Sequence, residues 1–143
     1  MPATDDAVAT ALDVVRAADD KKAADPVILD VADLLGLVDL FVIVTGHNEP
    51  QMKSILEEVE RVLRERRSLR PERREGTVQS GWSLLDYGDV VVHVFNREQR
   101  EYYDLERLWA DVPRRDVQSG EALAPLVERD RGAAVDESVT VDS

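Results

Sequence analysis

The residues that could perform acid–base or metal chemistry are few in this sequence, and their spacing favours no catalytic site. The chain has no cysteine, which excludes a disulfide framework, a thiolate metal site and a cysteine nucleophile. Its two histidines are His47 and His93. His93 lies between valines in a run typical of a strand, where we expect it to have a structural role. His47 is expected to be a turn residue. The alternative for His47 is anion binding, because the start of a helix follows it. Asp86 and Asp89 flank a turn signal, and we expect no catalytic residue, metal or cofactor.

Binding is the chemistry that the residues around Trp82 favour. An exposed tryptophan is among the side chains that dominate protein interfaces, although one on a short strand is as often part of the core. Leu84 shares the face of Trp82 by strand alternation, so the two should be buried or exposed together. Tyr102 and Tyr103 are adjacent in a predicted helix and cannot both face inward, so one should be available to a partner. Asp86 could instead stabilise the turn that follows its strand. The predicted partner-binding residues are Trp82, Leu84, Asp86, Tyr87 and Tyr102.

An arginine cluster occupies positions 61–74, with seven arginines against two glutamates. The simpler interpretation is a solvated helix end, because cations there are favoured by the helix dipole. The alternative is a contact with RNA phosphate, in which each arginine would steepen the salt dependence of binding. The candidates for that contact are Arg70, Arg73 and Arg74.

Composition limits the classes of protein to which the chain can belong. Its 143 residues suit one domain with a tail, and 43% hydrophobic residues can form one core. The net charge of -12 argues against a dedicated nucleic-acid binder. No apolar run approaches the roughly 20 residues of a membrane helix, and the start lacks a secretory signal. We therefore expect a cytoplasmic protein without a membrane contact.

Capping residues and hydrophobic periodicity predict the elements that must position these residues. Helices are expected to begin after Thr4, Asn48 and Asn96, the last two followed three residues on by a glutamine. Strands are predicted at 27–31, 40–44, 76–78, 82–85 and 90–95, the last two joined as a hairpin. Such an order predicts an α/β (α+β) fold, in which helices flank a mixed sheet.

The end of the chain divides into a helix and a tail. The helix after Asn96 should present one apolar face, formed by Tyr102, Leu105, Leu108 and Trp109, with Trp109 in the core. From Val117 the periodicity fades and acidic residues outnumber basic ones. We therefore predict a domain at 1–116 and a disordered acidic tail at 117–143.

The run from Gly81 to Phe95, which reads GWSLLDYGDVVVHVF, resembles the signature of the ribosomal silencing factor (RsfS/Iojap) family. The resemblance extends from about residue 7 to 111 and includes Leu29-Asp30-Val31 and a closing segment, LERLWAD. The chain departs from the pattern at Val38 and Leu40, where the family usually has Thr and Tyr. It also departs at Asn48, where the family usually has Ser.

The resemblance implies a nucleotidyltransferase-like fold that lacks the catalytic acids. An active transferase needs a Gly-Ser turn for phosphate and two acids one residue apart on the next strand for divalent metal. Here the turn is Gly46-His47, and no predicted strand carries such a pair. The resemblance therefore implies that the chain is not an enzyme; a residual nucleotide-binding enzyme is the alternative.

As to function, the resemblance implies a binding protein that acts by steric occlusion. Family members bind the large ribosomal subunit at its interface, on the ribosomal protein counted fourteenth in that subunit's series. They block joining of the small subunit and so repress translation under nutrient limitation. An assembly factor that uses the same surface is the alternative. Some members form homodimers off the ribosome, so a homodimer of the free chain is a further expectation.

Overall fold

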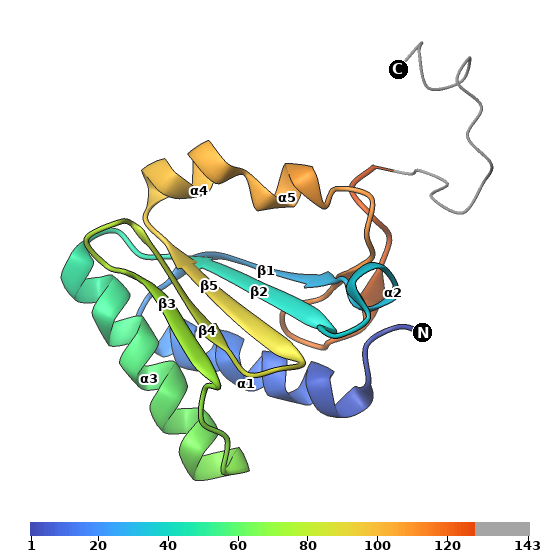
Figure 1. Ribbon diagram of the computed structural model, residues 1–143, viewed down its shortest axis with the longest axis horizontal. Helices are drawn as coiled ribbons and strands as arrows, with labels where there is room; N and C mark the ends of the chain where they lie inside the picture. Colours follow the sequence, from blue (N-terminus) through green and yellow to red (C-terminus); the bar gives the residue numbers. More distant parts are fainter. Residues whose placement is uncertain (128–143) are drawn as a thin grey trace.

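The computed structural model describes residues 1–127, whose strands form a mixed sheet with helices on both faces (Figure 1). The sheet has the order β3-β4-β5-β2-β1-β6-β7, in which β2 and β5 are parallel and the other neighbours antiparallel. The strands are β1 Ala24–Asp30, β2 Leu40–Thr45, β3 Arg73–Thr77, β4 Trp82–Asp86, β5 Val90–Phe95, β6 Arg114–Arg115 and β7 Ala122–Leu123. The predicted fold class is confirmed.

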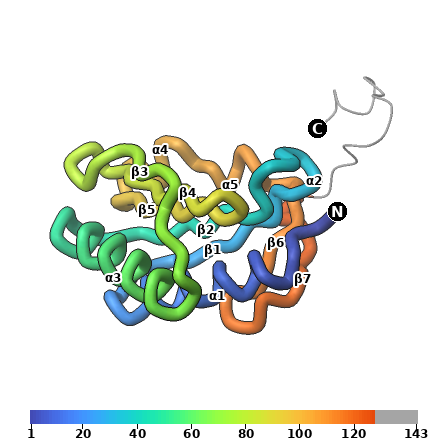
Figure 2. The backbone as a smooth tube through the Cα atoms, turned by 60° about the horizontal axis from the view of Figure 1, so that its bottom comes forward, coloured from blue at the N-terminus to red at the C-terminus, as the bar shows by residue number. Residues whose placement is uncertain are grey.

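The helices form two layers, one on each face of the sheet (Figure 1). α1 (Asp5–Asp20) and α3 (Glu49–Arg67) cover one face, and they lie side by side in Figure 2. α4 (Arg97–Tyr103) and α5 (Leu105–Leu108) lie over the other face, which is called the α4/α5 face below. The short α2 (Ala32–Leu35) joins β1 to β2. Within residues 1–127, no helix has the length and apolar character needed to cross a membrane.

Side-chain caps start the three helices whose beginnings the sequence predicted. The Thr4 hydroxyl accepts a hydrogen bond from the N–H of the third residue on, at 3.1 Å. The Asn48 and Asn96 side-chain carbonyls each accept one in the same way, at 2.8 Å. Each cap satisfies a backbone donor that the first helical turn leaves without an intrahelical partner. The predicted helix starts are confirmed.

Buried apolar residues on both faces of β5 hold the two helical layers to the sheet. Val90, Val92 and Val94 point toward α1 and α3, where they meet residues such as Val14 and Ile55. Phe95 points to the α4/α5 face, with Ile43, Leu29 and Val112. A strand that is buried on both faces reads as a continuous apolar run, as this one does.

The predicted final helix is broken at Asp104, so the prediction of one continuous apolar face was wrong. Asp104 has left-handed backbone angles (φ 49°, ψ 54°), and its N–H ends α4 by donating to the Arg100 carbonyl. Aspartate tolerates this conformation better than most residues. As a result Tyr102 and Leu108 point into solvent, while Leu105 and Trp109 pack against the sheet as half-buried residues.

The fold also continues past the predicted boundary at residue 116. β6 pairs with β1, and β7 pairs in turn with β6, so residues as far as Leu123 belong to the sheet. The loop between β6 and β7 packs on α1: Gly120 has φ +80°, and a Cβ there would lie 2.7 Å from a Val8 methyl. Residues 117–127 therefore belong with the folded part, and 128–143 lie outside the described residues.

Candidate functional site: an aromatic surface on the sheet

Strand alternation in β4 places Trp82 and Leu84 on the α4/α5 face. Both side chains are half-buried, whereas Ser83 and Leu85, which alternate with them, point the other way and are buried. The expectation that Trp82 and Leu84 are presented together is therefore confirmed. Neither lies fully in the core, so both remain partly accessible to a partner.

Contacts on three sides hold the Trp82 ring in place. The indole stacks on Phe95, with centroids 4.9 Å apart, and contacts Tyr103 of α4 at 4.4 Å. Its Nε1–H donates to Nδ1 of His93 at 3.2 Å. A ring that is already fixed loses little conformational entropy when a partner packs on it. Trp82 is thus a preorganised aromatic group.

His93 serves as the support beneath this ring. It is 5% exposed, and burial lowers its pKa to about 4, so the imidazole is neutral near pH 7. Because Nδ1 accepts the indole hydrogen, the ring's own proton is assigned to Nε2. Its ring also contacts Phe41, with centroids 4.9 Å apart. These contacts give His93 the structural role expected of it.

The two tyrosines at the end of α4 extend the accessible aromatic area. Tyr102 is 76% exposed and Tyr103 is 45% exposed, and their rings meet edge to face at 5.0 Å. The expectation that at least one tyrosine would face outward is confirmed. Sequence reasoning missed the role of Tyr103, because its contact with Trp82 joins segments that lie 21 positions apart. Trp82, Leu84, Tyr102 and Tyr103 are called the Trp82 surface below.

Asp86 has two structural partners at the end of β4. One carboxylate oxygen accepts the N–H of Gly88 at 2.8 Å, which is the expected turn chemistry. The other accepts from the Arg73 guanidinium at 2.7 Å. Burial alone would raise the pKa of Asp86, but these hydrogen bonds outweigh it and hold that pKa below its ordinary value. Asp86 therefore fixes the hairpin beside the Trp82 surface.

Tyr87 does not join this surface, which corrects its prediction as an accessible partner-binding residue. Alternation carries it to the face of Leu85, two residues before it, and it is 6% exposed in the core beneath α1 and α3. Burial raises the pKa of its hydroxyl. The sequence held this signal, because Trp82 and Tyr87 are five positions apart and so point to opposite faces.

Acidic neighbours pair with much of the arginine cluster. Arg74 pairs with Glu60 of α3 at 2.6 Å, and Arg73 pairs with Asp86. Arg67 donates to the buried Asp13 of α1 at 2.8 Å. Arg70 is exposed. This pairing favours the interpretation of a locally compensated helix end, and the contact of Arg70, Arg73 and Arg74 with RNA stays a prediction.

Comparisons of the sequence with known proteins point to one family. The model of the family described as "Ribosomal silencing factor during starvation" matches residues 4–141. Ribosomal silencing factor RsfS of Halalkalibacterium halodurans is 43% identical over 99 residues, which cover 69% of this chain and 84% of that protein. The RsfS of Bacillus subtilis is 38% identical over 73% of this chain and 87% of its own length. The chloroplastic protein Iojap of Arabidopsis thaliana is 33% identical over 75% of this chain and 44% of its own length.

Solved structures show the same architecture. A crystal structure of a protein from Chromobacterium violaceum aligns with a TM-score of 0.63 and 35% identity, covering 67% of this chain and 79% of that one. A structure from Bacillus halodurans aligns with a TM-score of 0.60 and 42% identity, covering 68% and 90%. From the family match and these relatives, the chain belongs to the family of ribosomal silencing factors.

Proposed function

We propose that this chain binds the large ribosomal subunit through the Trp82 surface and prevents the small subunit from joining. The partner would be the ribosomal protein counted fourteenth in the large-subunit series, at the subunit interface. The expected result is repression of translation in the cytoplasm when nutrients are limiting. No covalent chemistry is required of the chain, only affinity and bulk at the right position.

The single observation that carries the proposal is the fixed, partly exposed aromatic group around Trp82. Specific interfaces bury about 800 Å² on each partner, around aromatic anchors that contribute most of the binding energy. Trp82 and Tyr103 are such anchors, supported from below by Phe95 and His93. The exposed Tyr102 would add contact area at the rim of the same footprint.

Co-sedimentation of variants with purified large subunits tests this proposal. Trp82→Ala should weaken binding by about 2 kcal/mol, roughly 30-fold, as loss of a central aromatic anchor does. Tyr102→Ala tests the same surface with little risk to folding, because that side chain is 76% exposed. Leu123→Ala at β7, on the opposite edge of the sheet, is the control. Undiminished binding by folded Trp82 and Tyr102 variants would remove this surface from the interface.

A further inference from the structure

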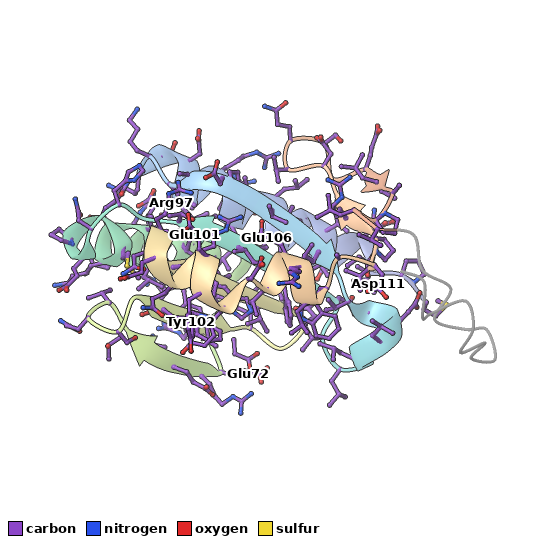
Figure 3. All side chains as sticks on the ribbon, turned by 90° about the horizontal axis from the view of Figure 1, so that it is seen from above. Glu72, Arg97, Glu101, Tyr102, Glu106 and Asp111 are labelled. Atoms are coloured by element: carbon purple, nitrogen blue, oxygen red, sulfur yellow. The ribbon has the colours of Figure 1, made fainter. Side chains whose placement is uncertain are left out.

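A pocket adjoins the Trp82 surface where β3 and β4 meet the end of α4. It is lined by Glu75, Gly76, Ser80, Trp82, Leu84 and Tyr103. Figure 3 looks onto the α4/α5 face, with Tyr102 on α4 and Glu72 next to β3 labelled. Glu75 faces the same way as Leu84, because the two are directly opposite in the β3–β4 ladder.

The polar groups that line this pocket mostly accept, rather than donate, hydrogen bonds. Glu75 brings a carboxylate whose side chain is 56% exposed. The indole N–H of Trp82 already donates to His93, and the Ser80 hydroxyl donates to the Thr77 carbonyl at 2.7 Å. The faces of aromatic rings are themselves electronegative. The pocket therefore combines a carboxylate with two rings, which suits a cation.

A neighbouring arginine compensates the Glu75 charge only weakly. Arg73 lies on the same face of β3, but its guanidinium is 2.7 Å from Asp86 and 3.9 Å from Glu75. Asp86 is the more buried of the two acids and accepts two hydrogen bonds from Arg73. The ion pair of Arg73 with Glu75 is thus the longer of the two, so the Glu75 carboxylate can also accept hydrogen bonds from a second cation.

Gly76 allows β3 to lie close against β4 beside the pocket. Its φ of +76° favours glycine, and a Cβ there would lie 2.0 Å from the Trp82 carbonyl oxygen. A side chain at this position would therefore push β3 away from β4. The close pairing brings the Glu75 carboxylate and the rings of Trp82 and Tyr103 to one pocket, where a flat group can approach all three.

We propose that this pocket receives an arginine side chain of the protein that the Trp82 surface binds. A planar guanidinium can stack on Trp82 or Tyr103 while its N–H groups pair with the Glu75 carboxylate. A lysine ammonium could reach the same carboxylate but would not stack in this way. The inference rests on the proposed function for its partner, and the pocket chemistry can be tested without ribosomes.

The first experiment titrates the free protein with butylguanidinium, butylammonium and neutral butylurea at constant ionic strength. The readout is the pair of indole N–H signals in a nitrogen–proton NMR spectrum, in which Trp109 is an internal control for Trp82. Butylguanidinium should shift the Trp82 signal and leave the Trp109 signal in place. Concentrations up to about 100 mM are needed, because one cation–π contact and one exposed ion pair bind weakly. Glu75→Gln should reduce that shift severalfold. Absence of a shift, an equal shift with either other probe, or an unchanged shift in Glu75→Gln would overturn the proposal.

The second experiment measures binding to the large subunit. Glu75→Gln should weaken it about five- to tenfold, whereas Glu57→Gln on the exposed face of α3, with the same change of charge, should not. If Trp82→Ala weakens binding roughly 30-fold and Glu75→Gln leaves it unchanged, the arginine pocket is refuted and the proposed function stands. If neither variant affects binding, the proposed function is refuted, and so is the proposal that the pocket receives an arginine of that partner.

Discussion

Removal of Glu106 should destabilise the fold through the arginine that it neutralises. Arg100 is 8% exposed and holds the α4–α5 break against the sheet. Its guanidinium donates two hydrogen bonds to Glu106, at 2.9 and 3.0 Å, and one to the Thr45 hydroxyl at 2.9 Å. Glu106→Ala leaves that buried cation with one neutral partner.

The loss of unfolding free energy in Glu106→Ala depends on how exposed the Arg100–Glu106 ion pair is to water. Loss of one partner of a buried ion pair costs about 3–5 kcal/mol. The Glu106 side chain is 26% exposed, so water can partly replace it, and we expect about 2–3 kcal/mol. The matched control is Glu65→Ala, which removes a partner of Arg61 where both side chains are about half exposed (48% and 56%); it should cost less than about 1 kcal/mol.

Urea unfolding followed by circular dichroism measures both variants. Replacing Arg100 by Met together with Glu106→Ala should cost less than Glu106→Ala and Arg100→Met added together, because no unpaired cation remains. Equal unfolding free energies for Glu106→Ala and Glu65→Ala would refute the claim that a buried ion pair secures the break between α4 and α5. So would strict additivity in the double variant.

Two further predictions concern buried polar groups near the hairpin. The pKa of His93 is about 4 in the folded chain and about 6.5 in the unfolded chain. Between pH 6.5 and 4 the unfolded state therefore binds more protons than the folded state, and the free energy of unfolding falls as the pH drops. His93→Phe should lose up to about 3 kcal/mol of that dependence, measured as unfolding free energy against pH; identical profiles would contradict it. The Tyr87 hydroxyl is buried without a hydrogen-bond partner among the described residues. Tyr87→Phe should therefore be neutral or stabilising by about 1 kcal/mol in thermal unfolding, and a clear loss would show that a partner exists.

Features encoded locally could be predicted from the sequence. The caps at Thr4, Asn48 and Asn96 each depend on residues within three positions, and the apolar run of β5 needs no distant partner to be recognised. Alternation in β4 likewise predicted that Trp82 and Leu84 share a face. Continued past Leu85, the same alternation puts Tyr87 on the opposite face of the sheet, where the structure has it.

Features that depend on distant contacts could not be predicted. β6 and β7 have two residues each, too few for a periodic pattern, and they exist as strands because β1 offers an edge for pairing. The break at Asp104 is accompanied by a hydrogen bond from Arg100 to Thr45, 55 positions away, which no local pattern indicates. The Glu75 pocket likewise needs β3, β4 and α4 brought together by the fold.

The most direct test of the central claim is subunit joining followed by light scattering. Purified large and small subunits are mixed with the wild-type chain, with Trp82→Ala or with Tyr102→Ala. The account predicts that a stoichiometric amount of wild-type chain suppresses the rise in scattering, that Trp82→Ala restores it, and that Tyr102→Ala, at the rim of the surface, restores it only in part. Full joining while the wild-type chain remains bound to the large subunit would contradict steric occlusion.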